Sequence, residues 1–196
     1  MLIVICLILI SQAASAGTAN REGNMNLTTV LRSDGPSKEL GDASGVYGWL
    51  IGSWDVRVID YEDGSKQERQ GEWHFGWILE GRAIQDVFVV PARRLRSAFN
   101  PIEGNRYGTT LRIYDRKTDA WRVIWNNPVT GVENRLIGKK VGNEIIQEGV
   151  EKDGSLIRWS FRDIHADSFH WTGEESHDQG KTWTLSVEFF CVRKND

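Results

Sequence analysis

Cysteine is scarce in this chain of 196 residues, which contains only Cys6 and Cys191. Cys6 falls within an apolar run at the N-terminus, so removal of that run would leave a single thiol. One thiol cannot form an internal disulfide, and the paired cysteine spacings of zinc sites are missing. The sequence therefore predicts neither a disulfide framework nor a structural zinc site, and its length suffices to bury a sizeable core.

The chain also lacks a strong charge of one sign and the common catalytic motifs. Its formal net charge is -3 and its pI is about 5.9, which gives no electrostatic footprint for nucleic acid. Its four histidines show no metal-ligand spacing. A Gly-x-Ser-x-Gly elbow, a phosphate-binding glycine loop and a dinucleotide-binding pattern are all missing. We therefore expect no metal, no cofactor and no nucleic-acid partner.

Helical periodicity of useful length is missing after residue 52, where apolar and polar residues alternate instead. Trp54, Val56 and Val58 fall on one face of the stretch 52–60, as in a half-buried strand. Turn signals such as Asp63-Gly64 separate the later segments and recur at short, regular intervals after Asp115. Closing such a meander buries its apolar face and removes its edges. The predicted fold is all-β: a single up-and-down antiparallel barrel of about ten strands.

The first residues differ in composition from the rest of the chain. Leu2–Ile10 is an apolar run, and Ala14-Ser15-Ala16 is a small-residue cleavage pattern. Together they predict a signal peptide over residues 1–16 and a secreted or periplasmic protein that is not inserted in a membrane after signal removal. No basic residue precedes the run, and translation from Met25 would instead give a cytoplasmic protein.

Two further segments follow the predicted signal peptide. Residues 17–45 are polar and rich in Gly, Ser, Asp and Asn, which indicates a flexible N-terminal arm. Pro36 can start a helical turn that Gly41 would stop. Residues 46–196 form the predicted barrel domain, and Val46–Ile51 is expected to be a short helical plug at one end of it.

Tryptophan is unusually abundant, with nine residues in the chain. A tryptophan is large and carries an N–H group that needs a partner when buried, so its placement carries information. The strand alternation puts eight of the nine on one inner surface, namely Trp54, Trp73, Trp77, Trp121, Trp125, Trp159, Trp171 and Trp183. Such a surface either fills a solid core or lines a cavity.

The cavity interpretation gives a set of ligand-binding residues. Flat aromatic walls with a few polar groups suit a small hydrophobic or aromatic molecule. The predicted lining is Trp73, Trp77, Gln85, Trp125, Asn127, Trp159, Trp171 and Glu175. The phase of the strand at 82–90 is not fixed by its pattern, so either Gln85 or Asp86 points inward.

Charged residues give three further expectations, and two of them leave alternatives open. Glu175 is the candidate catalytic residue, because burial without a partner would raise the pKa of its carboxyl group; alternatively it lies in water at the barrel rim. The loop 92–106, with four arginines beside Leu95 and Phe99, is either a lid or a solvated loop. Charged residues in the outward phase are expected to face solvent: Arg57, Glu72, Arg112, Arg158 and Arg162.

Several motifs resemble those of a known superfamily. Gly52-Ser53-Trp54 at the start of the first strand resembles the G-x-W motif of the lipocalin and fatty-acid-binding (calycin) barrels, and Arg193 stands where lipocalins often place an Arg against that Trp. The segments 81–85 and 114–125 resemble the bacterial DUF1579-type family. The chain lacks the disulfides of secreted lipocalins, and it lacks the C-terminal histidine of nitrobindin-type haem barrels.

This resemblance implies a barrel that holds a small molecule, and it leaves three functions open. The first is binding of a small hydrophobic or aromatic molecule. The second is an enzyme of lyase, hydratase or isomerase type that uses a buried carboxylate, since lipocalin-like folds host such activities. The third is a structural barrel without a ligand. The oligomeric state is left open as well.

Overall fold

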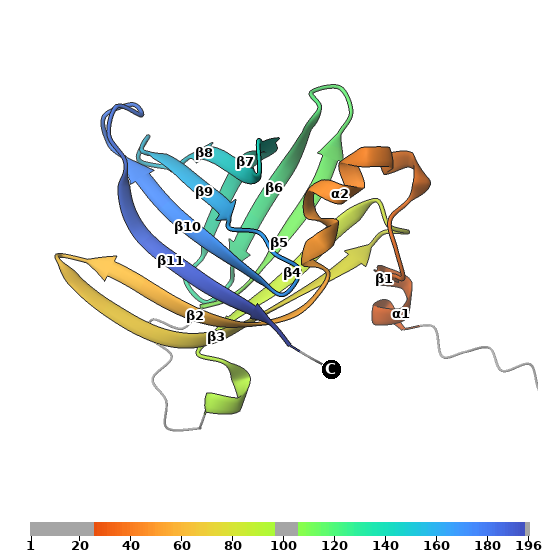
Figure 1. Cartoon of the computed structure of the whole chain (residues 1–196), viewed down its shortest axis with the longest axis horizontal. Helices are drawn as coiled ribbons and strands as arrows, with labels where there is room; N and C mark the ends of the chain where they lie inside the picture. Colours follow the sequence, from red (N-terminus) through yellow and green to blue (C-terminus); the bar gives the residue numbers. More distant parts are fainter. Residues whose placement is uncertain (1–25, 97–105, 195–196) are drawn as a thin grey trace, which may run out of the picture.

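The computed structural model describes residues 26–96 and 106–194, and these form an antiparallel β-barrel (Figure 1). Each of the strands β2 to β11 pairs with its neighbours in the sequence, and β11 pairs back onto β2. Pairing of β3 with both β2 and β4 closes the ring. The short strand β1 (Arg32–Ser33) adds to β3 beyond the start of β2. The predicted lipocalin-like, all-β barrel is confirmed.

The barrel strands are joined by short turns for the most part. Their bounds are β2 (Gly52–Glu62), β3 (Ser65–Ile78), β4 (Ala83–Val90), β5 (Arg106–Asp115), β6 (Ala120–Asn127), β7 (Val132–Val141), β8 (Glu144–Val150), β9 (Leu156–Arg162), β10 (Ser168–Ser176) and β11 (Thr184–Arg193). Asp63 and Gly64 have φ values of 48° and 73°, the left-handed pair that a two-residue hairpin turn requires. This turn chemistry explains why the strand divisions are readable in the sequence.

The segment before the barrel is a series of short elements. These are α1 (Leu27–Leu31), η1 (Lys38–Ala43), α2 (Ser44–Tyr47) and η2 (Gly48–Leu50). The predicted plug corresponds to α2 and η2, which bury Tyr47 and Leu50 completely. The predicted signal peptide, residues 1–16, lies outside the described residues. Among the residues that are described, no helix has the length and apolarity needed to span a membrane.

The plug closes one end of the barrel, which we call the closed end. Trp54 is fully buried there, and its indole N–H donates a 2.8 Å hydrogen bond to the carbonyl of Leu50. The guanidinium of Arg193 lies 4.1 Å from the centre of the Trp54 ring, while its two terminal nitrogens donate to the carbonyls of Ile51 and Trp49. The expected Arg–Trp contact is therefore confirmed. Through Arg193, the last strand of the barrel is joined both to the first strand and to the plug.

Tyr47 of the plug reaches into the barrel core. Its ring packs edge-on against Trp121 at 5.2 Å and Phe161 at 6.0 Å, and its hydroxyl donates to Oε1 of Gln147. A β-carbon on Gly138 would lie 2.2 Å from the Tyr47 hydroxyl, so only glycine leaves room for it. Burial raises the pKa of Tyr47 and keeps the hydroxyl a donor.

One predicted inner tryptophan, Trp183, lies on the outside of the barrel. The guanidinium of Arg158 stacks on its ring at 3.8 Å. The cause is a bulge in β11: Gly173 of β10 pairs with Val187, but the next residue pairs with Leu185, which leaves Ser186 as an extra residue. A bulge shifts the alternation of faces, so residues before Ser186 are out of phase with Phe189 and Cys191.

Candidate functional site

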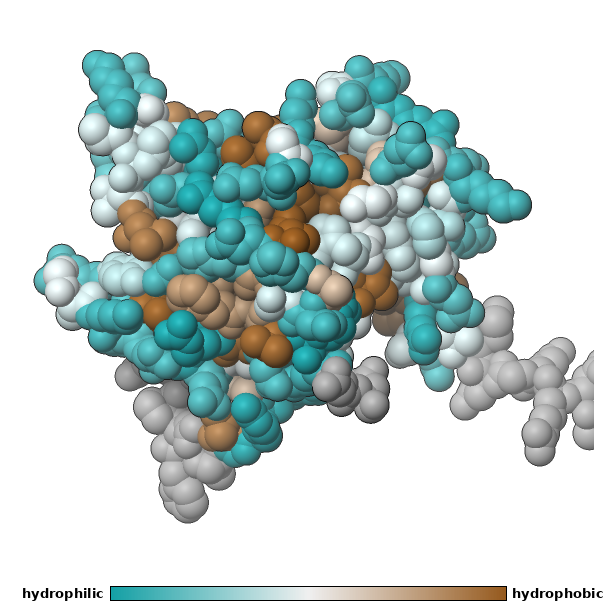
Figure 2. Space-filling model, in the orientation of Figure 1, coloured by the Kyte–Doolittle hydropathy of each residue, from teal (hydrophilic) through white to brown (hydrophobic). Residues whose placement is uncertain are grey.

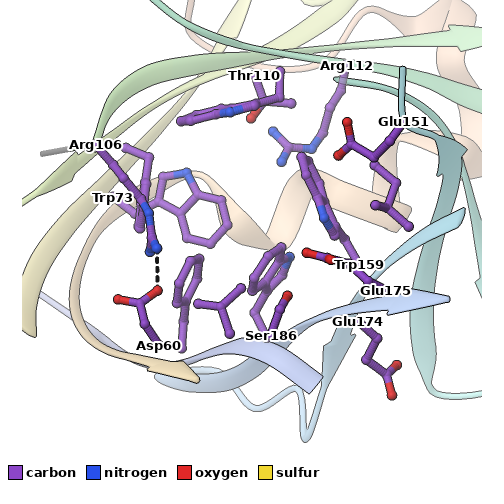
Figure 3. A pocket seen from close by; sticks show the side chains of 16 residues that line it. Asp60, Trp73, Arg106, Thr110, Arg112, Glu151, Trp159, Glu174, Glu175 and Ser186 are labelled. Atoms are coloured by element: carbon purple, nitrogen blue, oxygen red, sulfur yellow. Dashed lines mark hydrogen bonds and ion pairs between the residues drawn. The ribbon is translucent and has the colours of Figure 1, made fainter. Parts of the chain in front are cut away.

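The barrel interior opens into a cavity of about 300 Å³ away from the closed end (Figure 3). We call this part of the barrel the open end. The cavity is lined by Asp60, Trp73, Phe88, Arg106, Thr110, Arg112, Trp125, Glu151, Ile157, Trp159, Trp171, Glu174, Glu175, Ser186, Val187 and Phe189. In the space-filling view, hydrophilic residues cover the projecting strands and turns, whereas apolar residues gather in the recessed centre of the face (Figure 2).

Aromatic rings form the walls of the cavity. Trp171 stacks on Phe189 at 4.3 Å and lies 5.7 Å from Trp159, and Trp73 contacts Phe88 edge-on at 5.1 Å. Trp159 is only partly buried, because one side of its ring faces the cavity. A site of this kind offers flat apolar surface to a planar guest.

A glycine makes room for one of these walls. A β-carbon on Gly108 in β5 would lie 2.4 Å from the ring of Trp125, which is closer than real atoms approach. The indole of Trp125 therefore lies across the backbone of β5 and contributes to the lining. Any larger residue at position 108 would displace this ring.

The floor of the cavity is a buried ion pair between Asp86 and Arg112. Both side chains are almost completely inaccessible, at 0% and 2% exposure, and Nη1 of Arg112 donates to Oδ2 of Asp86. The other carboxylate oxygen of Asp86 accepts from the backbone N–H of Thr110. Arg112 also lies over the rings of Tyr47 and Phe75, at 5.3 and 5.5 Å, so it separates the closed end from the cavity.

The expectation that Arg112 faces solvent is therefore wrong, and Asp86 is the inward residue of its strand. The hairpin between β5 and β6 contains a signal that settles the orientation of Arg112 and Thr110, and Asp86 shares their face because it is directly opposite Thr110. Tyr114 is directly opposite Trp121, and directly opposite residues share a face. Because Trp121 points inward, Tyr114 and then Arg112 and Thr110 must do so too.

Four carboxylates surround the mouth of the cavity. Asp60 binds the guanidinium groups of both Arg69 and Arg106. On the opposite side Glu151 accepts a hydrogen bond from the amide of Asn134, and Glu174 lies 3.6 Å from Arg162. Glu175 lies 3.8 Å from His177 and is 44% exposed, so the rim position considered for it is the one observed.

The structure brings five of the eight predicted site residues to the cavity and places three elsewhere. Trp73, Trp125, Trp159, Trp171 and Glu175 line it. Trp77 packs below the floor, where its ring approaches Gly48 of the plug. Gln85 points outward and donates to the hydroxyl of Thr109, because Asp86 takes the inward phase. Asn127 accepts from the N–H of Val129 and caps the turn after β6.

Sequence reasoning also missed several lining residues besides Arg112. Thr110 follows from the hairpin register described above, but Glu151 and Ser186 lie at a strand end and in a bulge, where alternation gives no signal. Phe88 and Phe189 continue the inward phase of their strands. For Phe88, the assignment depends on fixing the phase of residues 82–90.

The described part of the loop 92–106 lies away from the cavity mouth. In η3 (Arg93–Leu95), Arg93 binds Glu72 on the outer wall of β3, at 2.6 Å between Nε and Oε1. Of the described residues of this loop, only Arg106 lines the cavity, where it binds Asp60. The lid hypothesis depends on Phe99 and the other residues of 97–105, which lie outside the described residues.

Glu72 is the centre of a polar network on this outer wall. Its side chain is only 7% exposed, contrary to the expected solvation. Burial by itself would raise the pKa of Glu72, but hydrogen bonds from Arg93 and His74 outweigh burial and lower the pKa to about 2. Lys194 lies 3.5 Å from the same carboxylate, so the network ties the end of the barrel chain to β3.

No protein-family model matches this chain, and no curated protein matches it. Several solved structures share its fold, among them these two. One is the S-type phycobiliprotein lyase CPES from Guillardia theta, at 8% identity and a TM-score of 0.54 over 79% of this chain and 93% of that one. The other is Rv2717c from M. tuberculosis, at 15% identity and a TM-score of 0.56 over 78% of this chain and 98% of that one. At these identities the likeness concerns the fold, and the chain has the fold of the lipocalin-like barrels.

Proposed function

We propose that the protein binds a small hydrophobic or aromatic molecule in the cavity at the open end. The observation that carries this proposal is the lining itself: four tryptophans from four strands face one space of about 300 Å³ that the core leaves open. In a barrel with only a structural role, we expect large side chains to fill such a space, because protein interiors are closely packed. The fold shared with a phycobiliprotein lyase is compatible with a small ligand.

The experiment that tests this proposal is a titration with N-phenyl-1-naphthylamine, an uncharged apolar dye. We expect saturable binding of one dye per protein, with quenching of tryptophan emission as the dye stacks on the indoles. Trp159→Ala should weaken binding about tenfold or more, because it removes a wall of the cavity. Trp183→Ala is the matched control, since its ring lies outside the barrel. Absence of saturable binding would contradict the proposal.

A second candidate function is catalysis in the same cavity. It is favoured by the presence of Glu175 and Arg112 in one lining, although Gln85 is absent from it. A carboxylate at the rim could exchange protons with a bound molecule that reaches the mouth. Glu175→Gln separates the two functions: a carrier keeps its affinity for the ligand, and an enzyme loses turnover.

Two finer features of the protein are proposals as well. Kinship with the DUF1579-type family rests on the segments 81–85 and 114–125. Export to a secreted or periplasmic location rests on the apolar run and the Ala14-Ser15-Ala16 pattern. N-terminal sequencing of the natural protein should then begin at Gly17, and a start at Met25 would instead indicate a cytoplasmic protein.

A further inference from the structure

Two buried hydrogen-bond donors, one in a wall and one in the floor of the cavity, have no acceptor among the residues that the structure describes. Counted as whole residues, Trp73 is 4% exposed and Arg112 is 1% exposed, yet Nε1 of Trp73 and Nε of Arg112 make no hydrogen bond to any described residue. Both residues line the cavity, and Figure 3 shows the indole of Trp73 and the guanidinium of Arg112 turned toward the same space. Buried donors are normally paired, so this pair calls for an acceptor that a ligand supplies.

We propose that the cavity selects an uncharged aromatic molecule with a carbonyl oxygen, which enters first and accepts from Trp73 and Arg112. This inference rests on the proposed binding function and adds the chemical class of the ligand. A carbonyl oxygen has two lone pairs and can accept from two donors at once. The aromatic part of the molecule would then lie between the indole walls.

The charge at the floor favours an uncharged acceptor over a carboxylate. Asp86 already neutralises Arg112, and its second oxygen is used by the N–H of Thr110. A ligand carboxylate at the floor would become a second anion beside one buried guanidinium. Burying an unpaired charge is far more costly than burying a hydrogen-bonded carbonyl group.

The negative charge at the cavity mouth also favours an uncharged ligand over an anionic one. Within residues 26–96 and 106–194, neither Glu151 nor Glu175 forms an ion pair with a lysine or arginine. The two arginines on the opposite side, Arg69 and Arg106, are engaged by Asp60. An anion that enters the cavity must pass these unpaired carboxylates, whose field repels it.

Donors without acceptors also occur at the closed end, and one of them provides a control. Nε1 of Trp121 is buried and has no partner in the described part of the chain, but Trp121 packs against Tyr47 and is not part of the cavity lining. If an unpaired indole N–H had no connection with a ligand, then Trp73 and Trp121 would respond alike when each is replaced by phenylalanine.

The test compares three probes built on one aromatic ring system: naphthalene itself, 2-acetonaphthone with its uncharged carbonyl group, and 2-naphthoate with its carboxylate. Calorimetric titration of the wild-type protein should show 2-acetonaphthone binding about tenfold more tightly than naphthalene, and 2-naphthoate binding more weakly than naphthalene. Equal affinities for naphthalene and 2-acetonaphthone, or tightest binding of 2-naphthoate, would overturn the inference and leave the binding function standing. Failure of all three probes to bind would instead overturn the binding function.

Two variants then test whether the Trp73 N–H group causes the preference for 2-acetonaphthone over naphthalene. Trp73→Phe removes the N–H and should reduce the tenfold preference for 2-acetonaphthone over naphthalene to about threefold. Trp121→Phe should leave that preference unchanged. If Trp73→Phe keeps the full preference while remaining folded by circular dichroism, the assignment to Trp73 is wrong. The comparison of probes on the wild-type protein requires no variant and decides the ligand class by itself.

Discussion

The two ends of this barrel use the same residue type for opposite purposes. At the closed end Trp54 and Trp121 are fully enclosed, and their rings contact Phe169 at 4.7 Å and Tyr47 at 5.2 Å. At the open end Trp125 and Trp159 are only partly buried and face a cavity. The difference is produced by the plug, which fills one end and stops at Arg112. Stability and binding are therefore carried by different tryptophans.

The largest expected effect is on the stability of the closed end. Trp54→Ala should lower the free energy of unfolding by about 3–5 kcal/mol, because it empties a fully packed site and removes the ring under Arg193. Denaturant titration measures this loss. Trp183→Ala is the control, with an expected loss of about 0.5–1 kcal/mol. Equal denaturant midpoints for Trp54→Ala and the wild-type protein would contradict the stabilising role of the closed end.

Acid should weaken the barrel through Glu72 on its outer wall. The pKa of this carboxyl group falls from its ordinary 4.5 in the unfolded chain to about 2 in the folded protein, so its contribution is present above pH 4.5 and is lost as the pH falls toward 2. Glu72→Gln should cost on the order of 1–3 kcal/mol at neutral pH. It should also flatten the dependence of stability on pH between about 4.5 and 2. A variant with an unchanged acid profile would exclude this role.

Removing one hydroxyl tests how tightly the plug is held. Tyr47→Phe should lower the free energy of unfolding by about 1–2 kcal/mol, because it leaves Oε1 of Gln147 buried without its donor. The measurement is thermal or denaturant unfolding at neutral pH. Dye affinity at the open end should not change, since the hydroxyl lies on the far side of Arg112. A large loss of affinity in this variant would show that the two ends are coupled.

The smallest expected effect on stability is at the open end. Trp159→Ala should lower the free energy of unfolding by less than about 1 kcal/mol. One side of the Trp159 ring already faces the cavity, so removal of the ring breaks few packing contacts. The same change should weaken dye binding about tenfold. A loss of stability as large as that of Trp54→Ala would contradict the division of roles between the two ends.

The barrel and its closed end were largely predictable from the sequence. Period-two alternation specifies strands, Asp63-Gly64 specifies a hairpin, and the G-x-W motif with Arg193 predicts the contact at the closed end. These features are local, or they depend on one pair of positions. A closed meander follows from them because each strand pairs with the next one along the chain.

The cavity was only partly predictable, and the errors have two physical causes. The charge of Arg112 predicts a solvent-facing side chain, whereas its orientation is decided by its place two residues before Tyr114, which is directly opposite the inward-facing Trp121. Uninterrupted alternation predicts that Trp183 points inward, but a bulge at Ser186 breaks the alternation without any mark in the sequence. Buried ion pairs and bulges depend on pairing between strands, which one strand's pattern does not contain.

The most direct test of the division between the two ends uses the indole N–H signals of the protein in ¹⁵N-edited NMR, assigned with Trp→Phe variants. On addition of N-phenyl-1-naphthylamine, we predict that the signals of the cavity tryptophans Trp73, Trp125, Trp159 and Trp171 shift with one common saturation curve. The signals of Trp49, Trp54 and Trp121 at the closed end should stay in place. Shifts confined to the closed end, or no saturable shift at any indole, would contradict the account.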